Sequence, residues 1–204
     1  MYDSIWVFRE MRSGGTWLCN FLAKALEKRH IFLEHHSQLA SNMQASSLHS
    51  KYLFSTHKLE YMKPVQDYDN PLIIRCARKD KFEQMLSEFF FAVTNRAVSN
   101  IYSENDKLRF DTMINVQSIN VSKNDVYNWI NRNLTDEADW KKFSENLNVH
   151  TVYYEDLIDG TRVNGIDLLL KFDEAITTKL PSYKQSVFFN YVEIKEWFNE
   201  YNAL

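Results

Sequence analysis

Short apolar runs alternate with longer amphipathic runs along the first half of this chain. We interpret the short runs as β-strands, and the runs with apolar residues three or four positions apart as helices. The pattern predicts strands over Ser4–Phe8, His30–Glu34, Tyr52–Ser55, Leu72–Cys76 and His150–Tyr154. It predicts helices over Thr16–Arg29, Lys81–Asn95, Lys123–Asn133, Asp136–Asn146, Gly165–Phe172 and Tyr191–Tyr201.

Strands that alternate with helices indicate a parallel sheet covered by helices. The run Leu72-Ile73-Ile74 is apolar at consecutive positions, as expected of a strand that is buried on both faces. We therefore predict an α/β fold with three layers, α/β/α, around a central and mainly parallel sheet. No repeat, low-complexity tract or Pro/Gly-rich linker interrupts the chain, so we expect a single domain over residues 1–204. The polar stretch Ala97–Val121 shows little periodicity and fits either a loop or short helices over the site.

Composition and charge narrow the class of protein. The chain has 204 residues, of which 45% are hydrophobic, and a formal net charge of −3. A negative balance argues against a nucleic-acid binder, which usually carries a basic surface. We see neither an apolar run of membrane-spanning length nor a signal peptide, and Cys19 and Cys76 form no CxxC motif. The expected location is the cytoplasm, with no membrane partner.

The turn between the first strand and the first helix carries the strongest chemical signal. It contains two of the four glycines in the chain, in the sequence Arg12-Ser13-Gly14-Gly15-Thr16-Trp17. Glycine permits a positive φ and a close approach of the backbone to a ligand. The N–H groups and the dipole at a helix start favour an anion. Arg12 adds a planar fork of donors, Ser13 and Thr16 add hydroxyl groups, and Trp17 offers a flat surface for a purine. An ordinary turn, with Thr16 as helix cap and Trp17 in the core, is the alternative.

This loop is not a Walker A motif, which requires GxxxxGK[ST]. Its cation precedes the glycines, and Trp17 follows the hydroxyl of Thr16. Instead, Arg12–Trp17 resembles the 5′-phosphosulfate loop, Lys/Arg-Ser-Gly-x-Thr-Trp, of the sulfotransferases that use 3′-phosphoadenosine 5′-phosphosulfate (PAPS). That resemblance implies a P-loop NTPase-like sulfotransferase fold.

A second match follows the strand Tyr52–Ser55. The segment Ser55-Thr56-His57-Lys58-Leu59 resembles the Lys-Thr-His segment of cytosolic sulfotransferases, which implies that His57 is the catalytic base. A histidine at the carboxyl end of a strand suits removal of a proton from an acceptor hydroxyl. Ser55 stands where those enzymes carry Lys, and Arg12 or Lys58 is expected to supply the missing charge.

A third match follows the strand Leu72–Cys76. Arg78 and Ser87 are nine positions apart, as in bacterial sulfotransferases with an Arg-x-Asp-Lys-x-x-Gln-x-x-Ser pattern. The resemblance implies that both residues bind the 3′-phosphate. The alternative is a solvated helix start with i,i+4 ion pairs. Arg75 lies inside the strand, and we expect it to pair with a carboxylate.

The fourth match is Tyr153-Tyr154-Glu155-Asp156-Leu157, which resembles the Tyr-Glu-Asp-Leu element of many sulfotransferases. It implies that Tyr154 lies near the nucleotide, whereas we interpret Glu155 and Asp156 as cap residues. The C-terminal Arg-Lys-Gly loop of the cytosolic enzymes is absent, and Lys184-Gln185 is the candidate to replace it.

The resemblance implies transfer of a sulfuryl group from PAPS to a hydroxyl or amine, leaving 3′,5′-ADP and requiring no metal. The expected acceptor is a small molecule, a glycan or a peptide. Glu34 and His36 are reserve candidates for the base. Two other functions stay open: a P-loop kinase of small molecules, and a nucleotide-binding module without catalysis.

Overall fold

The computed structural model describes residues 2–33, 52–94, 119–158 and 187–203. The described residues fall into two compact units. The first unit holds residues up to Lys79 together with those from Asp139 to 158, and the second unit holds the rest. The expectation of a single domain stays a prediction.

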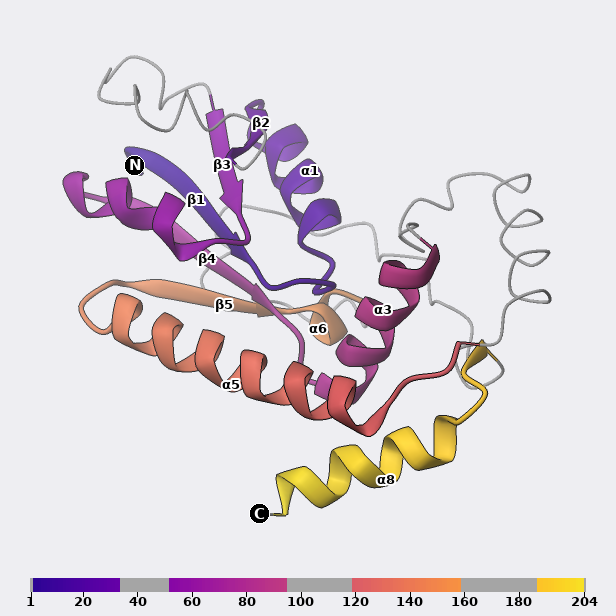
Figure 1. Ribbon diagram of the computed structural model, residues 1–204. Helices are drawn as coiled ribbons and strands as arrows, with labels where there is room; N and C mark the ends of the chain where they lie inside the picture. Colours follow the sequence, from indigo (N-terminus) through magenta and orange to yellow (C-terminus); the bar gives the residue numbers. More distant parts are fainter. Residues whose placement is uncertain (1, 34–51, 95–118, 159–186, 204) are drawn as a thin grey trace, which may run out of the picture. The chain divides into compact units, whose positions relative to one another are not determined.

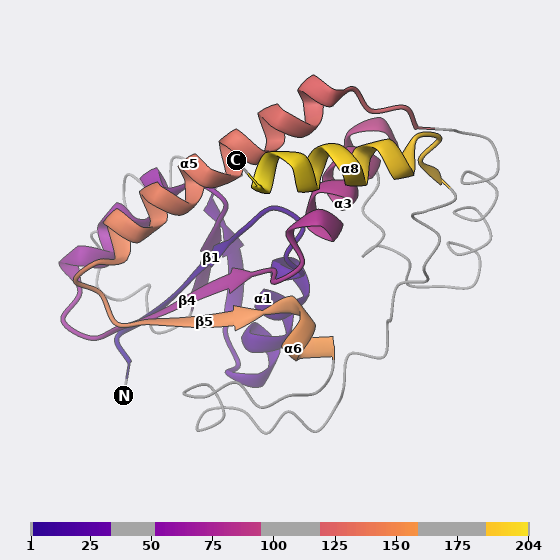
Figure 2. The same cartoon turned by 90° about the horizontal axis from the view of Figure 1, so that it is seen from below.

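A five-stranded, fully parallel sheet forms the centre of the first unit, as Figures 1 and 2 show. Its strand order is β2-β3-β1-β4-β5. The strands are β1 (Ser4–Arg9), β2 (Arg29–Phe32), β3 (Tyr52–Thr56), β4 (Pro71–Ala77) and β5 (Val149–Tyr153). All five predicted strands are therefore present, and the predicted α/β class with a parallel central sheet is confirmed.

The three inner strands β3, β1 and β4 are buried along most of their length. Successive side chains of a strand point to opposite faces, so both faces of the sheet are covered there. Ile5 and Val7 of β1 pack with helix α1 (Gly15–Ala25) on one face. Trp6 and Phe8 pack on the other face with the 3₁₀-helix η3 (Leu59–Asp67) and with Trp140. Figure 2 shows α1 on one side of the strands and the C-terminal end of α5 on the other. The first unit therefore has helix, sheet and helix layers.

Helix α1 ends four residues before the predicted Arg29. Glu27 has a φ of 52°, and this left-handed residue turns the chain. The amide of Lys28 donates to the Ala23 carbonyl at 2.7 Å and that of Glu27 to Lys24 at 3.2 Å. These two bonds form a Schellman motif. The predicted end was wrong because a glutamate, rather than a glycine, occupies the left-handed position.

One long helix replaces the two that we predicted over Lys123–Asn133 and Asp136–Asn146. Helix α5 runs without a break over Lys123–Ser144. The Thr135 hydroxyl donates to the carbonyl of Asn131, four residues earlier, at 3.0 Å. That bond satisfies the Thr135 hydroxyl within the helix.

The second unit consists of helices. It contains α3 (Lys81–Thr94), the part of α5 up to Ala138, and α8 (Tyr191–Asn202). Its buried core includes Met85, Leu86, Phe90, Val126, Trp129, Ile130 and Ile194. A short helix, α6 (Tyr154–Ile158), follows β5 in the first unit. The predicted helix over Gly165–Phe172 lies outside the described residues.

Candidate functional site

The loop between β1 and α1 turns on two residues with positive φ. Arg12 has a φ of 58° and Gly14 a φ of 75°. The Ser13 hydroxyl donates to the carbonyl of Glu10 at 2.7 Å, and Ser13 is 1% exposed. Ser13 therefore fixes the shape of the loop, and its hydroxyl proton is used within it.

Helix α1 begins at Gly15, and Gly14 is its N-cap. Among the described residues no side chain makes a capping hydrogen bond to this helix, and its first turn contains no acidic residue. The first N–H groups of an α-helix have no partner within the helix. The positive end of α1 is thus suited to an anion, as the glycine pair predicts.

The two glycines also make room for protein side chains. A Cβ at Gly14 would lie 2.5 Å from Cδ2 of the Tyr154 ring. A Cβ at Gly15 would lie 2.7 Å from Cγ and Cδ of Arg9. Each glycine is therefore required by a specific neighbour, one at the start of α6 and one at the end of β1. The sequence interpretation, close approach to a ligand, did not anticipate either contact.

Ion pairs surround the carboxyl ends of β1, β4 and β5. Arg75 and Glu10 lie 2.5 Å apart, with side chains 14% and 9% exposed, so the predicted carboxylate partner of Arg75 is confirmed. Lys79 pairs with Asp156, and the Lys79 amide donates to Glu155 at 2.9 Å. The acidic pair in the first turn of α6 thus holds the residue that follows the β4 strand end, and the cap role that we expected of this pair stays a prediction.

Arg78 lies at the centre of this region and is 8% exposed. Its Nε is 3.4 Å from a carboxylate oxygen of Glu155. Its guanidinium carbon lies 4.8 Å from the centre of the Tyr154 ring. Its Nη1 also makes a long contact, 3.5 Å, with the carbonyl of Arg12. Arg78 therefore joins the β1 loop, the β4 loop and α6.

Tyr154 packs its ring against the guanidinium of Arg78. Burial raises the pKa of the Tyr154 phenol above its ordinary value, and the charges of Arg78 and Arg12 oppose that rise. Tyr154 therefore keeps its proton at neutral pH and remains a hydrogen-bond donor. The structure thus brings together four residues that the sequence singled out: Arg12, Gly14, Arg78 and Tyr154.

His57 follows β3 and reaches the end of β1. Its Nδ1 is 2.5 Å from the carbonyl oxygen of Arg9. A carbonyl only accepts, so Nδ1 carries the proton and a neutral ring has its lone pair on Nε2. The Thr56 hydroxyl bonds the Lys58 amide at 2.9 Å and fixes the turn on either side of His57. Phe32 meets the ring edge to face, with centroids 5.3 Å apart. This tautomer is the one a general base needs.

Ser55, which stands at the position of the family's Lys, is 0% exposed and bonds to His30. The Nε2 of His30 is 2.6 Å from the Ser55 hydroxyl, and its Nδ1 is 3.2 Å from Oδ1 of Asn20. Burial, and then the charge of Arg9, lower the pKa of His30 to about 4. Its side chain completes a polar network beneath the site.

Lys58, one of two residues expected to replace the missing Lys, lies on the surface. Its side chain is 62% exposed and 4.0 Å from Glu60.

Arg9 is a site residue that the sequence analysis missed. It is 3% exposed, and its Nη1 donates to the Thr16 hydroxyl at 2.9 Å. Its guanidinium carbon lies 4.2 Å from the centre of the Phe32 ring. A signal was available, because Ile5 and Val7 face α1 and the same alternation directs Arg9 to that side.

The other predicted residues lie on α1, on α3 or outside the described residues. Trp17 stacks on Phe21, with ring centroids 5.1 Å apart, and packs against the core as its alternative interpretation predicts. Ser87 lies on α3 in the second unit, so its pairing with Arg78 stays a prediction. The remaining candidates lie outside the described residues: Glu34, His36, Lys184 and Gln185.

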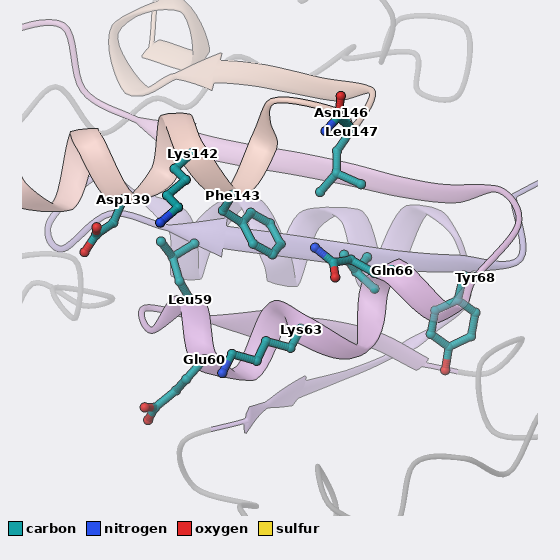
Figure 3. Close-up of a pocket in the computed structure, with 11 residues that line it drawn as sticks. Leu59, Glu60, Lys63, Gln66, Tyr68, Asp139, Lys142, Phe143, Asn146 and Leu147 are labelled. Carbon is teal, nitrogen blue, oxygen red and sulfur yellow. The ribbon is translucent and has the colours of Figure 1, made fainter.

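A pocket of about 580 Å³ opens in the first unit, away from the residues that the sequence singled out. Figure 3 shows that its walls come from η3 and from the end of α5. Its lining includes apolar Leu59, Val65 and Phe143 and the two lysines Lys63 and Lys142. None of the predicted site residues lines it. We place the candidate site at the carboxyl ends of the strands and not at this pocket, because parallel α/β sheets bind ligands at those ends.

Comparison of the chain with protein-family models, with curated proteins and with solved structures found no match. Among the residues that the structure describes, no helix has the length and apolar character needed to cross a membrane.

Proposed function

We propose that this chain is a sulfotransferase that moves a sulfuryl group from PAPS to a hydroxyl or amine acceptor. One observation carries the proposal. His57, the start of α1 and the pair Arg78–Tyr154 meet at the carboxyl ends of β3, β1, β4 and β5, linked by contacts through Arg9 and Arg12. In parallel α/β sheets this edge binds ligands. The proposal includes the finer fold, a P-loop-like sulfotransferase fold.

The start of α1 is proposed to bind the 5′-phosphosulfate. As the bond between sulfur and the bridging oxygen breaks, negative charge develops on the phosphate of the leaving 3′,5′-ADP. The N–H groups of the first turn and the Arg12 guanidinium stabilise that charge. Thr16, which is exposed at this turn, adds a hydroxyl. Because these groups are fixed in the folded loop, little reorganisation accompanies the reaction.

His57 is proposed to act as the general base. The acceptor oxygen or nitrogen forms a bond to sulfur and loses its proton to Nε2 of His57. The Nδ1–H bond to the Arg9 carbonyl holds the ring in this tautomer and stabilises the imidazolium that forms. General bases of this kind contribute about 10²–10⁴-fold to turnover.

Arg78 and Tyr154 are proposed to bind the nucleotide. Arg78 gives a two-pronged contact to the 3′-phosphate, and Tyr154 lies beside the nucleotide. For Ser87, the role at the 3′-phosphate stays what the sequence resemblance implies. A 3′-phosphate site distinguishes PAPS from ATP. The acceptor is proposed to be a small molecule, a glycan or a peptide. The proposed location is the cytoplasm, since Cys19 and Cys76 are free and buried.

The test follows sulfuryl transfer from ³⁵S-labelled PAPS to a library of hydroxyl and amine acceptors. With an acceptor in hand, His57→Ala lowers turnover by about two to four decades. The matched control is His150→Ala, a histidine on β5 outside the site. Near-normal turnover in purified His57→Ala contradicts the assignment of the base.

The two other functions predict different binding. A small-molecule kinase is stabilised by Mg-ATP, whereas a sulfotransferase is stabilised by 3′,5′-ADP in the absence of magnesium. A module without catalysis binds 3′,5′-ADP and transfers no label to any acceptor. Arg78→Met is expected to remove the preference for 3′,5′-ADP over 5′-AMP.

A further inference from the structure

The pocket between η3 and the end of α5 plays no part in the proposed sulfuryl transfer. All of its lining residues belong to the first unit. Its volume of about 580 Å³ falls within the range that is usual for small-molecule sites, about 300–1,000 Å³. Leu59 and Val65 on η3, with Phe143 and Leu147 at the end of α5, give it apolar walls. A hollow of this size and lining suits a small molecule with an apolar body.

The charged residues of the pocket gather at one end of it. η3 and α5 pass the pocket in the same direction, as Figure 3 shows, so the start of η3 lies beside Asp139 and Lys142. This end carries two carboxylates, Glu60 and Asp139, and two ammonium groups, Lys63 and Lys142. The polar side chains toward the other end are uncharged: Gln66, Tyr68 and Asn146. The pocket therefore has a charged end, an apolar middle and a neutral polar end.

Three of the four charged groups have no partner within the described part of the chain. There, no ion pair or hydrogen bond engages the side chain of Lys63, Asp139 or Lys142. Asp139 and Lys142 are three positions apart on α5, so they lie on the same face of the helix. Both signs of charge are thus presented together, beside an apolar wall, to whatever enters the pocket.

We propose that this pocket binds a small zwitterion with an apolar side chain, of the class of the apolar α-amino acids. The carboxylate of the ligand pairs with Lys142, its ammonium group pairs with Asp139, and its side chain packs on Leu59 and Phe143. The four charged residues sum to zero, so a zwitterion matches both signs. A simple anion is repelled by the two carboxylates, and a simple cation by the two lysines. The inference goes beyond the proposed sulfuryl transfer and does not depend on it.

Calorimetric titration of the full chain with four probes tests the match to both charges. The probes are L-phenylalanine, 3-phenylpropanoate, which lacks the ammonium group, 2-phenylethylamine, which lacks the carboxylate, and glycine, which lacks the apolar body. L-Phenylalanine is expected to bind most tightly. Loss of either charge is expected to weaken binding about two- to fivefold, the effect of one exposed ion pair. Glycine is expected to bind at least about tenfold more weakly, because it buries no ring.

Two charge variants assign the partners of the ligand. Lys142→Met is expected to weaken binding of L-phenylalanine and 3-phenylpropanoate about two- to fivefold and to bind 2-phenylethylamine no more weakly than the parent chain. Asp139→Asn is expected to weaken the two probes with an ammonium group and to spare 3-phenylpropanoate. The probe that each variant spares shows that the variant is folded. The matched controls are Lys141→Met and Asp69→Asn, at exposed positions outside the pocket, and both are expected to bind every probe as the parent chain does.

Gln66→Trp tests whether binding occurs in this pocket. Gln66 is exposed and lines the pocket, so an indole at this position covers the apolar wall, and binding of L-phenylalanine is expected to fall at least about tenfold. Unchanged binding by Gln66→Trp contradicts the site, as does a parent chain that binds no L-phenylalanine at about 10 mM. Equal affinity for all four probes, or equal losses of every probe in both charge variants, contradicts the zwitterion. If the expected pattern holds but 3′,5′-ADP does not bind, the pocket stands and the sulfotransferase proposal fails.

Discussion

The substitution Gly15→Ala sets two physical effects against each other. Gly15 is the first residue of α1, and replacing glycine by alanine in a helix usually stabilises it by up to about 1 kcal/mol. In this structure, however, the new Cβ would lie 2.7 Å from Cγ and Cδ of Arg9 and 2.8 Å from its Cβ. Carbon atoms prefer separations of about 3.5–4.0 Å.

The crowding is expected to outweigh the gain in helix propensity. The Cβ of Arg9 is fixed by β1, and its stem is buried, so neither side can yield without moving the strand or the helix. Overpacking of this kind costs about 1–3 kcal/mol. Because three atoms of Arg9 would lie nearly 1 Å closer than the preferred separation, the cost of Gly15→Ala is expected toward the upper end of this range. After the propensity gain is subtracted, the net loss is about 1–2 kcal/mol in the free energy of unfolding.

Urea and thermal denaturation measure this loss. For a chain of this length, a loss of 1–2 kcal/mol lowers Tm by roughly 2–8 °C. In an Arg9→Ala background two of the three close contacts disappear, and the cost of Gly15→Ala is expected to fall by at least half. A Gly15→Ala protein that is more stable than the parent chain refutes the reasoning. An equal cost in both backgrounds refutes the role of Arg9.

Three further predictions follow from buried groups. Arg75→Met removes the ion-pair partner of the buried Glu10 carboxylate, so we expect a loss of about 3–5 kcal/mol in the free energy of unfolding. Adding Glu10→Gln to Arg75→Met is expected to recover a large part of that loss. If the double variant recovers no stability, a buried ion pair is contradicted. The pKa of His30 is lowered to about 4, so the unfolded state binds more protons below about pH 6.5, and stability falls as the pH drops from there toward 4. His30→Gln is expected to reduce this fall in stability by on the order of 1–2 kcal/mol, after allowance for the partial exposure of His30 to solvent. If the stability of His30→Gln depends on pH as that of the parent chain does, the lowered pKa of His30 is contradicted. Burial raises the pKa of Cys19 to about 11 and that of Cys76 to about 12. A thiol reagent at pH 8 should therefore label neither cysteine in the folded chain and both cysteines in urea. Fast labelling of the folded chain contradicts their burial.

The apolar periodicity was enough to predict the sheet. The β1 residues Ile5, Trp6, Val7 and Phe8 are all buried because helices cover both faces, and such two-sided burial leaves a continuous apolar run in the sequence. Helix boundaries were harder to predict. Glu27 takes a left-handed conformation without being glycine, and local residue preferences do not indicate this.

The candidate site was predicted in part. Motif positions after strands led to Arg12, His57, Arg78 and Tyr154, because the carboxyl ends of parallel strands meet at one edge. The role of Arg9 was not foreseen, since it depends on contacts with Thr16 and Gly15 that only the folded loop creates.

Contacts between residues far apart in the sequence likewise cannot be predicted from the local apolar pattern. The bond between His30 and Ser55 joins residues 25 positions apart. The close approach of Gly14 to Tyr154 joins the loop after the first strand to the start of α6, which follows the last strand. Such contacts are decided by the strand order, which the sequence pattern did not specify.

Nucleotide binding without magnesium tests the central claim most directly. In a thermal-shift experiment, 3′,5′-ADP at about 100 times its Kd is expected to stabilise the chain by about 2.7 kcal/mol, which raises Tm by roughly 5–11 °C. Mg-ATP at the same concentration is expected to leave Tm unchanged, and Arg78→Met is expected to abolish the response to 3′,5′-ADP. Stabilisation by Mg-ATP alone, or by neither nucleotide, contradicts a PAPS site at the carboxyl ends of these strands.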